Sequence, residues 1–178
     1  MAEFDIRPYS SAHGGHMRVS HGYLEGTPAA GAFEKGDVVQ IVAASGRMDE
    51  AADDPNIKAA PPGAVGVAAE GAQQIADARG DGTIANSEDE PVAYYPFDRD
   101  NYFVTRNITN NAPTALVPTV ANIGDLATLS LTAGVWSLDV GGTNEDFEIV
   151  QLLDADGKDA VANGTTAVAA VFRLSTTA

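Results

Sequence analysis

The segment best suited to metal chemistry is the aspartate-rich run Asp154-Ala155-Asp156-Gly157-Lys158-Asp159. Calcium binds six to eight oxygen ligands, and an EF-hand loop supplies a bidentate Glu at its twelfth position. With Asp154 as the first position, the twelfth residue is Thr165, and no helical pattern flanks the run. An Asp-Gly turn between strands is therefore the preferred interpretation, and Asp154 and Asp156 are only weak candidates for a cation site.

The three histidines of the chain, His13, His16 and His21, lie within nine residues of one another. Neutral imidazole is a good zinc ligand, but this spacing matches no closed zinc site, and Gly14-Gly15 separates the first two. A polar N-terminal segment is the preferred interpretation. The alternative is a metal site shared where copies meet at a symmetry axis. We expect no cofactor.

Motifs for catalysis are missing. The chain has no Gly-x-Ser-x-Gly elbow, no phosphate-binding Gly-x-x-x-x-Gly-Lys and no His-Glu-x-x-His. A glycosidase-like carboxylate pair stays open, but Asp98 and Asp100 are better explained as turn residues. The tripeptide Arg79-Gly80-Asp81 matches an integrin ligand, but the chain has no signal peptide or disulfide to support adhesion. We expect a protein that is not an enzyme.

The densest aromatic patch lies at residues 94–103 and contains Tyr94, Tyr95, Phe97, Tyr102 and Phe103. Alternation along a strand would place some of these rings on an outer face, where aromatic side chains contact carbohydrate or protein. The other interpretation is that they fill one end of a barrel.

The composition limits the kinds of partner and site that the chain can have. The 178 residues carry a formal net charge of −15, which argues against binding to nucleic-acid phosphates. Without cysteine, there is no disulfide framework or thiol nucleophile. No run approaches the roughly 18 apolar residues of a membrane span, and residues 1–11 lack the apolar region of a signal peptide. We expect synthesis and folding in a cytoplasm.

Short β-branched and aromatic runs, separated by Gly, Pro and Asp, predict a mainly β fold, a barrel or sandwich of about nine strands. Residues 1–31 are expected to form an extended arm, and residues 32–178 the β domain. The turn-like run at residues 98–101 predicts a hairpin. The expected strands are 33–44, 64–69, 92–97, 102–108, 117–120, 126–131, 135–140, 147–153 and 168–174. The expected core residues are Val38, Ile41, Val67, Phe103, Val104, Leu129, Leu131, Trp136, Leu138, Phe147, Ile149, Leu152, Val171 and Phe172.

Two segments share one outline. GDVVQIVAASGRM (36–48) and GDLATLSLTAGVW (124–136) each open on Gly-Asp, continue as an apolar strand, and reach a second Gly ten residues later. Each then carries a large apolar residue, Met48 or Trp136. This self-similarity predicts two related β units, at residues 32–110 and 118–174.

The run Phe33-Glu34-Lys35-Gly36-Asp37-Val38-Val39, followed by Gly63-Ala64-Val65-Gly66-Val67-Ala68, resembles the head decoration, or cement, proteins of tailed bacteriophages. The resemblance covers mainly residues 31–69, with a weaker echo at 122–153. It implies a non-catalytic virion protein on the capsid exterior that binds the major capsid protein, often as a trimer. The long N-terminal segment and second Gly-Asp unit depart from the smallest members and put the oligomeric state in doubt.

On this interpretation the arm and the C-terminal residues 173–178 extend along neighbouring subunits, and many weak contacts add up through avidity. The alternative is a carbohydrate-binding or adhesion module of a virion or tail that uses Tyr94, Tyr95 and Tyr102. A calcium-dependent structural module is a third possibility. The candidate contact residues are Phe4, Ile6, Tyr9, Met17, Tyr23, Tyr94, Tyr95 and Tyr102.

Overall fold

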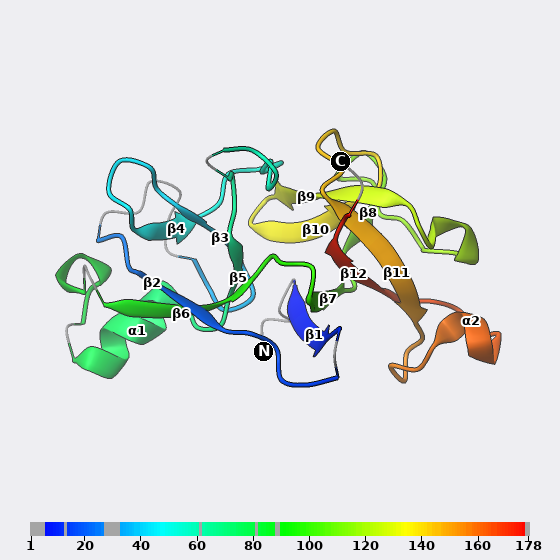
Figure 1. Cartoon of the computed structure of the whole chain (residues 1–178), viewed down its shortest axis with the longest axis horizontal. Coiled ribbons are helices and arrows are strands. Elements are labelled where there is room, and N and C mark those ends of the chain that lie inside the picture. The colour runs from blue at the N-terminus through cyan, green and yellow to red at the C-terminus, as the bar shows by residue number, and fades with distance from the viewer. Residues whose placement is uncertain are drawn as a thin grey trace. The chain divides into compact units, whose positions relative to one another are not determined.

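The computed structural model describes residues 6–12, 14–26, 33–60, 62–80, 82–87 and 90–176. Strands account for 38% and helices for 10% of the structure, which confirms the prediction of a mainly β protein. The strands form two sheets (Figure 1). The chain divides into two compact units, of which unit 1 contains Arg18–Ala52 and Asn56–Phe97, and unit 2 contains Asp5–Met17, Asp53–Pro55 and Asp98–Ala178.

Unit 1 holds a five-stranded antiparallel sheet with the strand order β2-β6-β5-β3-β4. Its strands are β2 (Ser20–Tyr23), β3 (Val38–Ile41), β4 (Met48–Glu50), β5 (Gly66–Ala68) and β6 (Pro91–Pro96). Helix α1 (Ala72–Arg79) and the 3-10 turn η1 (Ile84–Asn86) connect β5 to β6. The buried residues that form its apolar core cluster are Leu24, Phe33, Val39, Met48, Ala68, Ala72, Ile75 and Val92.

Unit 2 holds a seven-stranded sheet with the order β1-β7-β12-β11-β9-β10-β8. The strands are β1 (Arg7–Ser11), β7 (Asn101–Thr105), β8 (Ile108–Thr109), β9 (Leu126–Thr132), β10 (Val135–Asp139), β11 (Phe147–Leu153) and β12 (Ala169–Leu174). The 3-10 turn η2 (Val120–Asn122) precedes β9, and helix α2 (Ala160–Asn163) lies between β11 and β12. In the core, the Phe172 ring packs 5.9 Å from Phe103 and edge-on, 5.4 Å, against Phe147.

The two units share one topology. Numbered along the chain, the five strands of unit 1 lie in the order 1-5-4-2-3, and β7, β9, β10, β11 and β12 of unit 2 lie in the same order. In both units a helix precedes the last strand. In both, a residue shortly after the first strand forms a parallel bridge to the third strand: Leu24 with Met48, and Ile108 with Leu138.

The Gly-Asp pairs play the same role in both units. The Gly36 amide donates to the Ala68 carbonyl over 3.0 Å, and the Ala68 amide donates to the Asp37 carbonyl over 2.9 Å. In unit 2, the Gly124 amide donates to the Ile149 carbonyl over 2.8 Å, and the Ile149 amide donates to the Asp125 carbonyl over 3.0 Å. Gly36 and Gly124 have φ of 97° and 90°, a left-handed region that favours glycine. We call these paired bonds the Gly-Asp frame.

Several local expectations are corrected. The expected hairpin at residues 98–101 is wrong, because β6 and β7 lie in different sheets. The Asp98 carboxylate instead accepts hydrogen bonds from the Asp100 and Asn101 amides, so the same polar residues form a local turn before β7. Residues 117–120 form no strand, and the described strands form open sheets without a closed barrel.

The similarity between residues 36–48 and 124–136 also aligns one pair of residues, Met48 and Trp136, that are not structural counterparts. β3 and β4 pair Ile41 with Met48, whereas β9 and β10 continue to Thr132 and Val135 before turning. The hairpin of unit 2 is therefore longer. Met48 and Leu138 each form the parallel bridge of their own unit, so the counterpart of Met48 is Leu138 and not Trp136.

Most of the predicted core is buried. Ile41 is the clear exception: it is the last residue of β3 and is 41% exposed. Val104 and Leu131 are half-buried. The eleven buried members are Val38, Val67, Phe103, Leu129, Trp136, Leu138, Phe147, Ile149, Leu152, Val171 and Phe172.

Candidate functional site

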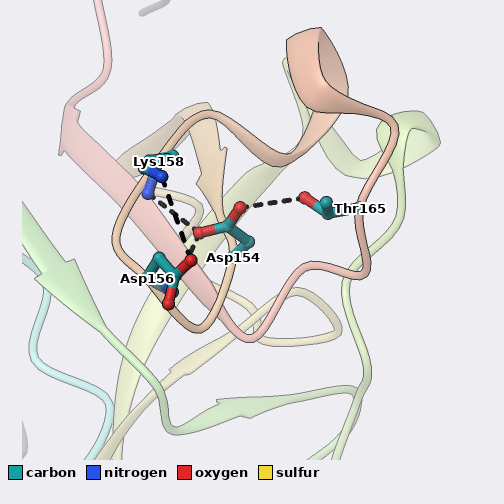
Figure 2. A network of polar contacts seen from close by, with 4 residues as sticks. All are labelled: Asp154, Asp156, Lys158 and Thr165. Carbon is teal, nitrogen blue, oxygen red and sulfur yellow. Dashed lines mark hydrogen bonds and ion pairs between the residues drawn. The ribbon is translucent and has the colours of Figure 1, made fainter.

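The polar contacts of the Asp154 loop centre on the Asp154 carboxylate (Figure 2). Asp154 Oδ1 accepts hydrogen bonds from the Asp156 and Lys158 amides, both over 2.9 Å, and Oδ2 accepts one from the Thr165 hydroxyl over 3.0 Å. The bond from the Lys158 amide, followed by those from Thr165 and Asp156, lowers the pKa of Asp154 despite its partial burial. The loop is a turn organised around one carboxylate.

This geometry gives a metal ion little to bind. Thr165 does occupy the twelfth position, but its hydroxyl donates to Asp154, and Lys158 Nζ lies 4.0 Å from Asp156 Oδ2. His16 and His21 are exposed, while His13 lies outside the described residues. Throughout the described part of the chain, no three His, Asp or Glu side chains gather into a group that could hold a metal ion.

The described part of the N-terminal segment contributes one strand to each sheet. β1 pairs with β7, and β2 pairs with β6. Among the candidate contact residues, Tyr9 and Tyr23 are exposed, by 42% and 58%, whereas Ile6 is fully buried. Met17 is half-buried, and Phe4 lies outside the described residues. Among the expected arm contacts that the structure describes, Tyr9 and Tyr23 offer an exposed aromatic ring.

The three tyrosines of the aromatic patch are all half-buried. Tyr94 packs against the core of unit 1, and Tyr102 packs beside a small cluster of Leu153, Ala169 and Val171 in unit 2. Arg173 donates to the Tyr102 hydroxyl over 3.4 Å and lies 5.9 Å from its ring centroid. Arg173 also pairs with Glu148 at 3.3 Å. Tyr102 is thus engaged within its own sheet.

The sequence predicted no role for Asp53 and Asp54. The Asp54 carboxylate accepts hydrogen bonds from the Thr128 and Thr143 hydroxyls, both over 2.7 Å. Asp53 Oδ1 accepts from the Leu131 amide over 2.7 Å and from the Ser130 hydroxyl over 3.1 Å. The three residues Asp53–Pro55 therefore belong to unit 2, although the residues on either side of them belong to unit 1.

Burial alone would raise the pKa of Asp54, but hydrogen bonds from Thr143, Thr128 and Asn144 together outweigh it and lower the pKa. Asp54 is therefore an ionised structural acceptor. The only signal for it in the sequence is the clustering of acidic residues at 49–54, which does not reveal donors 74 to 90 residues away.

A second missed feature is a run of exposed aliphatic side chains between β8 and β9. Val117, Val120 and Ile123 are 67%, 63% and 39% exposed. The sequence predicted a strand at residues 117–120, which include two of these side chains. The described residues therefore offer contact surface in the form of exposed apolar and aromatic side chains.

In comparisons with protein-family models, with curated proteins and with solved structures, no match to this chain was found. Among the described residues, none of the helices is long and apolar enough to cross a membrane.

Proposed function

We propose that this chain is a virion structural protein that binds the outer surface of a tailed-phage capsid and stabilises it. The observation that supports this most is the Gly-Asp frame. It joins the two segments that resemble decoration proteins, because Gly36 and Asp37 exchange main-chain hydrogen bonds with Ala68. The residues that carry the resemblance therefore form one structural motif rather than two unrelated stretches.

The frame recurs in unit 2, so one chain presents two similar β units. A protein that binds a repeating surface gains avidity when each molecule offers several attachment points. The strong negative charge keeps such a protein soluble before it binds. The partner on this proposal is the major capsid protein.

The test is binding to expanded capsid shells of the same phage, assembled without this chain. We expect saturable co-sedimentation at a fixed ratio to capsid subunits, together with a higher melting temperature of the shells. Shells that neither bind the chain nor gain heat resistance would contradict the proposal. A glycan array run in parallel addresses the carbohydrate alternative, and it is preferable to tryptophan fluorescence because Trp136 is fully buried.

Variants sharpen this test. Deletion of residues 1–25 is unsuitable because it removes β1, β2 and the buried Leu24. Tyr23→Ala removes a ring that is 58% exposed and should weaken shell binding without unfolding unit 1. Val161→Ala, a change at a similarly exposed site on α2, is the matched control and should bind as the wild type does.

A further inference from the structure

The connection between β8 and β9 combines exposed apolar side chains with a complete lack of charge. No charged residue occurs from Asn107 to Gly124, in a chain where 20% of residues are charged. Asp125 is the single charged residue between Arg106 and Asp139. We call residues 107–124 the uncharged segment. Figure 1 draws its η2 turn, in yellow-green, projecting from the strands of unit 2.

The uncharged segment is held in place by hydrogen bonds. The Leu116 amide donates to the Ile108 carbonyl over 2.8 Å, and the Asn110 amide donates to the Thr114 carbonyl over 2.9 Å. A capping box between Thr119 and Asn122 closes η2, and Asn122 Nδ2 donates to Asp125 Oδ2 over 2.9 Å. Pro118 is buried between exposed neighbours.

Because the backbone is fixed, Val117 and Val120 project from a preformed surface. Binding through a preformed surface loses less conformational entropy than binding through a loop that must become ordered. Interface cores are depleted in charge and enriched in apolar groups relative to the rest of a surface. The segment has both properties, whereas a solvated connection in so acidic a protein would be expected to carry carboxylates.

We propose that the uncharged segment is the surface through which two copies of this chain associate. The net charge of −15 favours a second copy of the chain over a basic partner at this segment. A basic partner would be drawn to the acidic surface rather than to the stretch that lacks charge. A second copy is repelled wherever carboxylates face one another, and it can approach closely only where they are missing. This association does not depend on capsid binding.

The test is the mass of the full chain by light scattering across a concentration series. We expect the wild type to associate and Val120→Asp to raise the dissociation constant by about tenfold or more, since it replaces a buried aliphatic contact with a charge. Val161→Asp, at a valine 45% exposed on α2 of the same unit, is the matched control and should associate as the wild type does. Circular dichroism confirms that each variant is folded.

The proposal would be overturned by a wild type that stays monomeric at every concentration, or by a Val120→Asp variant that associates normally. It would also be overturned if Val161→Asp raised the dissociation constant as much as Val120→Asp does. Val120→Lys separates apolar contact from charge. It should also weaken association, and tighter association of this variant would show a contact driven by charge instead. Added NaCl should strengthen wild-type association by screening repulsion between the copies, and weaker association in salt would count against a second copy as the partner.

Discussion

The carboxylate of Asp54 is held by two threonine hydroxyls, although the residue has a φ of 50°. A non-glycine residue with positive φ is uncommon, and Asp and Asn tolerate it better than most. Hydrogen bonds to a charged group contribute about 1.5–3 kcal/mol each. The strained backbone is thus offset by bonds that only a short carboxylate at this position can accept.

We expect Asp54→Ala to lower the free energy of unfolding by roughly 2–4 kcal/mol, because it leaves two partners without an acceptor and retains the positive φ. Asp54→Asn keeps one acceptor oxygen and the tolerance of positive φ, so it should cost less. Urea denaturation monitored by circular dichroism measures both. An alanine variant as stable as the asparagine variant would contradict the role assigned to the carboxylate.

The same residue predicts a pH dependence. The pKa of Asp54 is below its ordinary value of 3.8 in the folded protein, so its stabilisation is complete above that value and is lost as the pH falls through the folded pKa. The stability difference between the wild type and Asp54→Asn should therefore be constant near neutral pH and shrink below about pH 4. A difference that grows on acidification would refute the ionised acceptor.

Gly66 shows why the Val-Gly-Val sequence needs its glycine. A Cβ at this position would collide with the Tyr95 carbonyl oxygen and approach the Tyr94 ring to 2.7 Å. Because a backbone atom cannot move aside cheaply, Gly66→Ala should destabilise unit 1 by about 1–3 kcal/mol. Gly15→Ala is the control, since its Cβ would meet only Ser11 Oγ at 3.9 Å. Equal melting temperatures for the two variants would contradict this explanation.

Among the strands, sequence reasoning worked where the apolar pattern was strong and local. The expected strand at 147–153 coincides with β11, and those at 126–131 and 135–140 match β9 and β10 closely. It failed at residues 98–101, because turn composition does not reveal which strands pair. The expected strands also omit β4, because the acidic Asp49 and Glu50 interrupt the apolar pattern although both lie in a strand.

The candidate site was harder to predict because its determinants are not local. The acceptors Asp53 and Asp54 find their donors on β9 and in the Thr143 loop, far along the chain. Ile6 resembled an exposed contact residue, yet it is fully buried. At Asp154 the sequence lacks the Glu of a calcium loop, and the structure forms a turn around the Asp154 carboxylate.

The β9–β10 hairpin contains a turn that can be improved. Ala133 and Gly134 connect paired residues Thr132 and Val135 with φ of 52° and 78°, the signature of a type I′ turn. Asn-Gly is the favoured pair for this turn because Asn tolerates positive φ better than Ala. Ala133→Asn should therefore raise the free energy of unfolding by about 0.5–1 kcal/mol, measured by chemical denaturation.

A matched variant tests the cause. Ala133→Val introduces a β-branched side chain at positive φ and should lower stability by a similar or larger amount. If valine stabilised the hairpin and asparagine did not, strand propensity rather than turn geometry would govern this position.

For the molecule as a whole, a charge of −15 opposes compaction through self-repulsion. Salt shortens the range of that repulsion, to a Debye length of about 10 Å at 0.1 M. We therefore expect the melting temperature to rise between low salt and about 0.3 M NaCl, as measured by calorimetry at a protein concentration where the chain is monomeric. A melting temperature that falls with added salt would indicate that attractive ion pairs outweigh the repulsion.

The Gly-Asp frame has a consequence for how this protein can evolve. Its bonds join main-chain atoms, so they are indifferent to nearly every side chain around them, and only the glycines, at φ of 97° and 90°, are tightly constrained. Substitutions can then change the surface of one unit while the other unit keeps its contacts. Because the chain contains the same scaffold twice, a new binding specificity can arise in one unit without loss of the existing specificity of the other.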